Sequence, residues 1–130
     1  MNKYIADTMA IVLRLEQRKM PNKIREKFEQ AEKGHTEILI PSIVFAEIGY
    51  LSEKKKIDTD LQEVRKYLNT YKTINEYPLT FETVIKAFDI SDIPELHDRL
   101  IAACGKELNI EIITNDPDME SSGYVKTIWK

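Results

Sequence analysis

Short apolar runs alternate along this chain with longer stretches in which apolar residues recur at helical spacing. Five runs predict strands: Tyr4–Asp7, Glu37–Ile40, Lys72–Asn75, Glu111–Thr114 and Val125–Ile128. The longer stretches predict helices: Thr8–Gln17, Asn22–Lys33, Ser42–Lys55, Asp58–Thr70, Thr80–Phe88 and Asp92–Leu108. The alternation predicts an α/β fold, in which three α/β/α layers are built on a short parallel sheet of about four to five strands.

Local signals define several of the helix ends. Gly34 follows the second helix, where a left-handed residue commonly ends a helix. Ser42 is a candidate N-cap, and Asp92 with Glu95 resembles a capping box for the last long helix. Small residues from Ala102 to Gly105 predict that this helix packs closely against the sheet.

Three carboxylates lie in otherwise apolar surroundings. Asp7 is the only charge between Lys3 and Arg14, and Glu47 is the only charge between Glu37 and Glu53. The third, Asp116, follows the run Ile-Ile-Thr-Asn. A buried carboxylate is costly to desolvate, so it is neutralised, paired with a cation or bound to a metal.

The predicted topology brings these acids to one edge of the sheet. Asp7 ends the first strand, Asp116 follows the fourth, and Glu47 lies on the helix after the second. Ligands of parallel α/β sheets bind beyond the carboxyl ends of the strands. Asp98, in the first turns of a helix, is expected at the same edge. We therefore predict that the four side chains form one metal-sized cluster.

Each acid also has an ordinary structural interpretation. Asp7 or Thr8 could cap the following helix, and Asp98 suits the positive end of a helix dipole. The segment Asn115–Asp118 consists of residues that favour turns. Glu47 could form an ion pair with a distant Lys or Arg. The order of all four acids along the chain favours a common site over four separate explanations.

Composition limits the class of protein. The 130 residues suit one domain, 1–130, and 42% hydrophobic with 32% charged residues predicts a folded, soluble chain. No apolar run approaches the roughly 20 residues of a membrane helix, and a signal peptide is not evident. The single cysteine, Cys104, excludes an intrachain disulfide and is expected to pack in the core. These features predict a cytoplasmic protein with no membrane association.

The net charge of −3 does not favour binding nucleic acid through bulk charge. A nucleic-acid substrate would require a bound cation and a local basic patch. Two candidate patches exist, one formed by Lys19, Lys23, Arg25 and Lys27 and the other by Lys54–Lys56. Either could simply be solvated helix surface.

The ordered motifs resemble the PIN-domain nucleases, and within them the VapC-type ribonuclease toxins of toxin–antitoxin pairs. The most specific similarities are His-Asp-Arg-Leu-Ile-Ala-Ala at residues 97–103 and Ile-Thr-Asn-Asp at residues 113–116. Asp7-Thr8, Glu47 and the closing Val125–Trp129 also match the family pattern. The resemblance covers nearly the whole chain.

The resemblance implies a Mg²⁺- or Mn²⁺-dependent endoribonuclease with Asp7, Glu47, Asp98 and Asp116 as its acidic quartet. Glu47 either binds the metal through water or orients the attacking water. Thr8 and Thr114 would not bind the metal themselves but would hold the carboxylates in place. Asp118 is a lower-ranked fifth carboxylate. His97 is interpreted as a helix-surface residue outside the site.

The resemblance further implies an RNA substrate, an antitoxin protein that occludes the acidic site, and a homodimer. All-oxygen donors independently suit hard cations, and no Cys/His cluster indicates zinc. Two alternatives remain open: a non-toxin RNA-processing nuclease of the same fold, and a catalytically inert PIN-like module that binds a protein. Haloacid-dehalogenase phosphatases are disfavoured because Met9 stands where their second Asp is required.

Overall fold

A five-stranded parallel sheet organises the chain, and the computed structural model describes all residues, 1–130. The strands follow the spatial order β3-β2-β1-β4-β5. They are β1 (Asn2–Ala6), β2 (Thr36–Pro41), β3 (Ile74–Tyr77), β4 (Ile112–Ile113) and β5 (Thr127–Ile128). The helices are α1 (Thr8–Leu15), α2 (Asn22–Glu32), α3 (Ser42–Glu53), α4 (Leu61–Thr70), α5 (Phe81–Phe88), α6 (Leu96–Leu108) and α7 (Pro117–Glu120). The predicted three-layer α/β/α architecture is confirmed.

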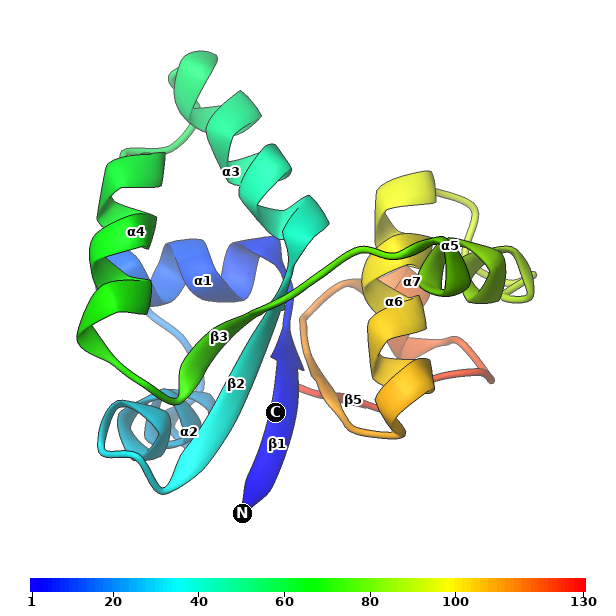
Figure 1. The fold of residues 1–130 in the computed structure, drawn as a ribbon, viewed down its shortest axis with the longest axis horizontal. Coiled ribbons are helices and arrows are strands. Elements are labelled where there is room, and N and C mark those ends of the chain that lie inside the picture. Colours follow the sequence, from blue (N-terminus) through cyan, green and yellow to red (C-terminus); the bar gives the residue numbers. More distant parts are fainter.

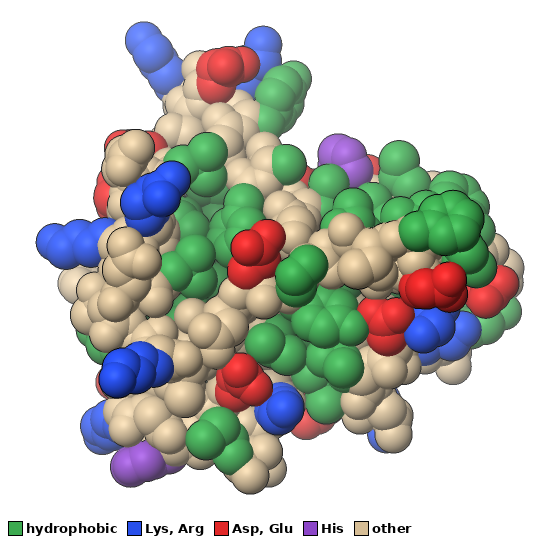
Figure 2. Space-filling view, in the orientation of Figure 1, with side chains coloured by type: hydrophobic (Ala, Val, Ile, Leu, Met, Phe, Trp, Pro, Cys, Tyr) green, Lys and Arg blue, Asp and Glu red, His purple; other side chains and the backbone are tan.

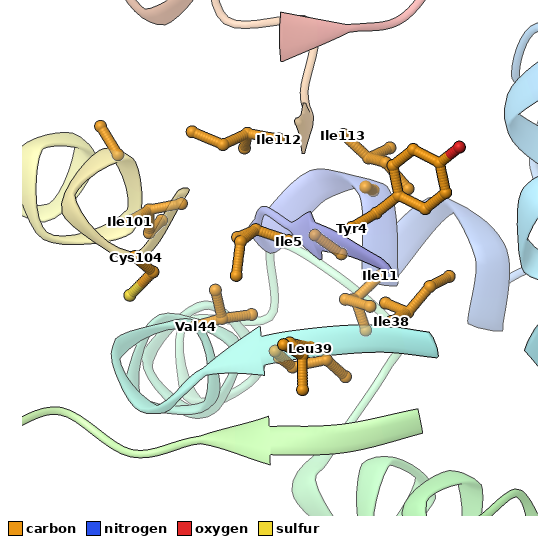
Figure 3. Close-up of a cluster of buried hydrophobic side chains, with 14 of the residues drawn as sticks. Tyr4, Ile5, Ile11, Ile38, Leu39, Val44, Ile101, Cys104, Ile112 and Ile113 are labelled. Carbon is orange, nitrogen blue, oxygen red and sulfur yellow. The ribbon is translucent and has the colours of Figure 1, made fainter. Parts of the chain in front are cut away.

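Helices cover both faces of the sheet. Helices α1 to α4 lie on one side and α5 to α7 on the other (Figure 1). Apolar side chains from both layers meet on the central strands; Ile5 of β1, Val44 of α3 and Ile101 of α6 lie in this core (Figure 3). Cys104 is buried there too, as the sequence predicts. None of the helices combines the length and the apolar surface that a membrane span requires.

Helix α6 packs closely on the sheet at Gly105. A Cβ atom placed on Gly105 would lie 2.6 Å from Cγ1 of Ile112 on β4, far inside normal contact. Ala102 and Ala103 beside it are fully buried. The small residues therefore allow the close approach that the sequence predicts, and this approach fixes where the first turn of α6 lies.

A network around Glu32 joins three helices on the other side. Arg14 of α1 donates two hydrogen bonds to its carboxylate, at 2.9 and 2.6 Å. The Tyr67 hydroxyl of α4 donates a third, at 2.6 Å. Because Glu32 ends α2, this carboxylate connects α1, α2 and α4 through charged hydrogen bonds.

Two predicted caps are wrong. Ser42 is the first helical residue of α3, and Pro41 takes the N-cap position. The Ser42 hydroxyl instead donates to Glu76 at 2.9 Å and joins α3 to β3. Likewise Glu95, not Asp92, caps α6 by accepting from the Asp98 N–H at 2.8 Å. Asp92 accepts hydrogen bonds from the loop after α7, because that loop folds back over it.

Several segment boundaries also differ from the prediction; for example, α4 begins at Leu61 rather than Asp58, and α6 begins at Leu96 rather than Asp92. The third strand begins two residues later, at Ile74, because Ile74 pairs in register with the buried Ile38. The segment after β4 is a one-turn helix, α7, which the sequence had indicated only as a turn. Its N-cap is Asp116, whose carboxylate accepts from the Met119 N–H.

Candidate functional site

The carboxyl edge of the sheet brings the predicted acids to one cavity. Asp7 and Asp116 follow β1 and β4, whose register pairs Ala6 with Ile113. Helices α3 and α6 contribute Glu47 and Asp98 to the same place. The cavity has a volume of about 200 Å³ and is lined by nine residues: Asp7, Thr8, Met9, Glu47, Leu51, Asp98, Ile101, Asn115 and Asp116. No Lys or Arg is among them.

Asp7 is the most buried of the four acids, with 7% of its surface exposed. One carboxylate oxygen caps α1 by accepting from the Ala10 N–H at 3.0 Å. The other accepts from the Thr114 hydroxyl, which in turn accepts from the Asp116 N–H at 3.0 Å. Burial raises the pKa of Asp7 to about 6; Asp116 and Glu47 add repulsion, and the hydrogen bonds from Thr114 and Ala10 oppose the shift.

Glu47 is held from two sides. The Thr8 hydroxyl, at the start of α1, donates to one carboxylate oxygen of Glu47. Nδ1 of His97, at the start of α6, lies 3.3 Å from the other oxygen. No Lys or Arg pairs with Glu47, so the ion pair considered from the sequence does not form.

The interpretation of His97 as a helix-surface residue is confirmed, because its side chain is 46% exposed and does not line the cavity. Its ring nevertheless contacts Glu47, an acid of the cavity, and this contact was not predicted. The sequence contained one usable signal, namely that His97 is adjacent to Asp98 on the helix that carries this acid into the cavity. The contact itself depends on how α3 and α6 approach each other, which no local pattern specifies.

Asp98 is only partly exposed and accepts no hydrogen bond through its side chain. Burial raises its pKa to about 7, and the carboxylates of Asp116, Glu95, Glu47 and Asp7 add repulsion. Two acids with raised pKa values in one cavity indicate a concentration of negative charge. Such perturbed groups mark candidate functional sites.

The four acids do not form the metal-sized cluster that the sequence predicted. No three acidic, histidine or cysteine side chains lie close enough together to hold a metal ion jointly. The reason is visible in the contacts: Asp7 and Asp116 each cap a helix, and Glu47 is bound to Thr8 and His97. Mutual repulsion also favours separation of the carboxylates. Asp118 is exposed and is not among the residues that line the cavity.

The donor set still fits a hard divalent cation. Every candidate ligand is a carboxylate oxygen, and the cavity offers no thiolate that would favour a softer metal. A cation would compensate repulsion that no Lys or Arg of the lining offsets.

The fold and the cavity define a class of protein: a three-layer α/β/α domain with acids converging at the carboxyl edge of a short parallel sheet.

The sequence matches the PIN domain family over residues 4–122, and the chain belongs to that family. Solved structures share its fold. VapBC2 from Rickettsia felis, bound to promoter DNA, aligns with a TM-score of 0.74 at 20% identity, covering 98% of this chain and 99% of that one. VapBC from Salmonella typhimurium, also bound to DNA, gives 0.72 at 18% identity and covers 98% of both chains.

A third structure, Mycobacterium tuberculosis VapC20, described as a toxin that cleaves the sarcin–ricin loop, aligns with a TM-score of 0.68 at 12% identity. It covers 98% of this chain and 99% of that one. At these identities the similarity establishes the fold. A comparison with curated protein sequences found no match.

Proposed function

We propose that this protein is a metal-dependent endoribonuclease and the toxin of a type II toxin–antitoxin pair. The observation that carries the proposal is the convergence of Asp7, Glu47, Asp98 and Asp116 on one cavity of a PIN-family fold. The similarity in fold to VapC structures supports the same conclusion.

Each residue has a role in the proposed reaction. Asp7, Asp98 and Asp116 would hold Mg²⁺ or Mn²⁺ after their side chains move closer together than they are in the metal-free protein, since the cation would offset their repulsion. Glu47 would either hold the cation through water or orient the attacking water. When bound, the cation supplies a water of lowered pKa and polarises the phosphodiester. The contacts of Thr114 with Asp7, and of Thr8 with Glu47, restrict the rotation of these two carboxylates. Outer contacts of this kind fix the geometry of metal ligands.

A nuclease assay tests this proposal. We expect cleavage of RNA with Mg²⁺ or Mn²⁺ and none with EDTA. Asp7→Asn and Asp98→Asn should each abolish cleavage, whereas Asp58→Asn, an exposed acid remote from the cavity, should not. Asp118→Asn should also retain activity because its side chain is outside the cavity. Wild-type cleavage rates in Asp7→Asn would refute the role of the acids.

The ends of the products distinguish two chemistries. Hydrolysis by water leaves a 5′-phosphate and a 3′-hydroxyl, whereas attack by the RNA 2′-hydroxyl leaves a cyclic phosphate. The cavity has no pair of histidines to catalyse the second route, since His97 is the only histidine near it. End-labelling should therefore detect 5′-phosphates. Cyclic 2′,3′-phosphates that persist in EDTA would contradict the proposal.

We further propose an antitoxin that blocks the cavity. A concave site with four acids and no basic lining suits an inserted Arg, which pairs bidentately with carboxylates. Expression of this chain alone should arrest growth, and co-expression of an adjacent small gene product should restore it. Harmless overexpression and no co-purified partner would instead favour an RNA-processing nuclease or an inert module.

We also propose a homodimer, with α5 in its interface. Phe81, Ile85 and Phe88 lie along one face of α5 and are 76%, 43% and 61% exposed. Figure 2 shows hydrophobic side chains gathered over this helix. Contiguous apolar surface of this kind is unusual on a monomer. Light scattering should give a dimer mass for the wild type and a monomer mass for a Phe81→Ser/Phe88→Ser variant. A monomeric wild type would refute the proposal.

A further inference from the structure

One basic segment that the proposed reaction does not use lies beside the acidic cavity. Helix α3 extends away from the sheet (Figure 1), and Lys54, Lys55 and Lys56 follow directly on its last residue. Glu47, which lines the cavity, lies two turns earlier on the same helix. The helix therefore connects the acidic site to a cluster of positive charge.

Helical geometry places Glu47 and the first lysine of the cluster, Lys54, on a common face of α3. Glu47 and Leu51 are separated by four residues and both line the cavity. Tyr50 and Lys54 follow Glu47 by three and seven residues, which are the spacings of neighbours along one helix face. With a rise of about 1.5 Å per residue, Tyr50 lies about 4.5 Å and Lys54 about 10.5 Å beyond Glu47 along the axis.

The side chains on this outer part of α3 are available for binding. Tyr50 is 60% exposed, and the Lys54 ammonium lies 5.5 Å from the centre of its ring. All three lysines are exposed, and none forms an ion pair. Glu53 is the one acid within the exposed run, so positive charge prevails. Figure 2 shows basic side chains at the end of this helix, beside one acidic side chain.

Two of the four cations in the other basic region contact neighbouring side chains, whereas Lys19 and Lys23 are exposed and have no such contact. The Lys27 ammonium donates to the Tyr4 hydroxyl at 3.1 Å and lies 4.7 Å from the centre of that ring. The Arg25 guanidinium donates to the side chain of Asn22. Lys27 thus joins α2 to β1, and Arg25 contacts its own helix. Lys54–Lys56 have no such partner outside α3, and they follow the helix that carries Glu47 into the cavity.

We propose that the outer part of α3 binds the RNA strand next to the scissile phosphate. The lysines would contact phosphates, and an unpaired base would stack on Tyr50. The inference rests on the proposed nuclease function. A chain with net charge −3 and an acidic site repels RNA, so a local source of attraction is required. Stacking on an exposed aromatic ring favours single-stranded over paired RNA.

An experiment must distinguish RNA binding by the lysines from a purely structural role in stabilising α3. Cations at the end of a helix interact favourably with its dipole, independently of any ligand. Lys55 offers a discriminating variant, because its backbone is left-handed with φ +58°, where glycine is usual. Lys55→Gly removes the charge without imposing backbone strain. We expect this variant to bind RNA more weakly while its melting temperature does not fall.

The principal experiment measures fluorescence anisotropy of a labelled single-stranded RNA, in an Asp7→Asn background so that no cleavage occurs. We compare Lys54→Gln/Lys55→Gln/Lys56→Gln with a matched control, Lys33→Gln/Lys66→Gln/Lys72→Gln. The control lysines are exposed, form no ion pairs and lie toward the amino edge of the sheet. Both variants lose the same charge, so only position differs.

We expect the first triple variant to bind RNA about tenfold or more weakly than the parent. The plot of log K against log salt should also become shallower, its slope decreasing in magnitude by about 2, because each of three lost phosphate contacts contributes about 0.7. The control should change neither. Tyr50→Leu should weaken binding of single-stranded RNA about tenfold, with Tyr50→Phe close to wild type and duplex RNA unaffected.

Equal behaviour of the two triple variants, or no effect of Tyr50→Leu, would overturn this inference and leave the surface to a protein partner or to solvent. Cleavage by the wild-type chain, measured in parallel, keeps the two proposals separate. Metal-dependent cleavage with unchanged binding by the first triple variant refutes only the surface. Binding through the surface without any cleavage refutes only the proposed nuclease function.

Discussion

Replacing Asp7 by Asn should stabilise the metal-free protein at neutral pH. Asp7 is 7% exposed, and burial raises its pKa from the ordinary 3.8 to about 6. This separation of about 2.2 pH units corresponds to about 3 kcal/mol at 1.36 kcal/mol per unit. The side-chain oxygen of Asn can still accept the hydrogen bond from the Ala10 N–H, without a buried charge. Its NH₂ group, however, replaces the oxygen that accepts from Thr114, and this loss reduces the gain. The gain is therefore at most about 3 kcal/mol, or roughly 10 °C in melting temperature.

The pH dependence of unfolding tests whether the buried charge of Asp7 causes this difference in stability. Between pH 4 and about pH 6, folded Asp7 retains its proton whereas unfolded Asp7 has lost it, so the folded state binds more protons. Stability of the wild type consequently falls as pH rises through this window and then levels off. Asp7→Asn lacks this contribution, so the two proteins should have similar stability near pH 4 and differ most at pH 8.

Thermal unfolding followed by circular dichroism in EDTA, from pH 4 to pH 8, measures both effects. Asp58→Asn, which removes an exposed charge, serves as the control and should follow the wild type. Mg²⁺ or Mn²⁺ should raise the melting temperature of the wild type only, since Asp7→Asn lacks a proposed ligand. A difference between wild type and Asp7→Asn that does not vary with pH would show that burial of the charge is not its source.

Three further changes test individual contacts. Gly105→Ala should destabilise the fold by about 1–3 kcal/mol in urea unfolding, because the new Cβ would overlap Ile112, whereas Gly123→Ala, with its nearest contact at 3.9 Å, should be nearly neutral. Tyr67→Phe should cost about 1–2 kcal/mol through loss of its hydrogen bond to Glu32, and an unchanged urea midpoint would contradict this. His97→Ala should lower kcat about tenfold or more with little change in KM, and His97→Asn should recover part of the loss by again donating to Glu47. Equal activity of the two His97 variants would exclude a positioning role.

Hydrophobic patterning predicted the fold because each element carries its own signal. The strand at Thr36–Pro41 and the helix at Phe81–Phe88 are recognisable from apolar period and local caps, and both were predicted to within one or two residues. Caps that depend on distant partners were not predicted. The sequence predicts Asp92 as a cap of α6, but its carboxylate oxygens instead accept hydrogen bonds from Ser122 and Gly123, about thirty residues away along the chain.

The sequence by itself determined that the acids reach one edge, because alternating strands and helices predict parallel strands, whose carboxyl ends all lie at the same edge of the sheet. The strand order itself came only from the structure. Only the tertiary structure decided how these acids are held. Thr114 reaches Asp7 across 107 residues and Thr8 reaches Glu47 across 39, and the approach of α6 to α3 brings His97 to Glu47. Burial and mutual repulsion likewise raise the pKa values of Asp7 and Asp98 only once the chain is folded. Local patterns encode backbone conformation, whereas hydrogen-bond partners, desolvation and charge separation depend on distances that packing alone sets.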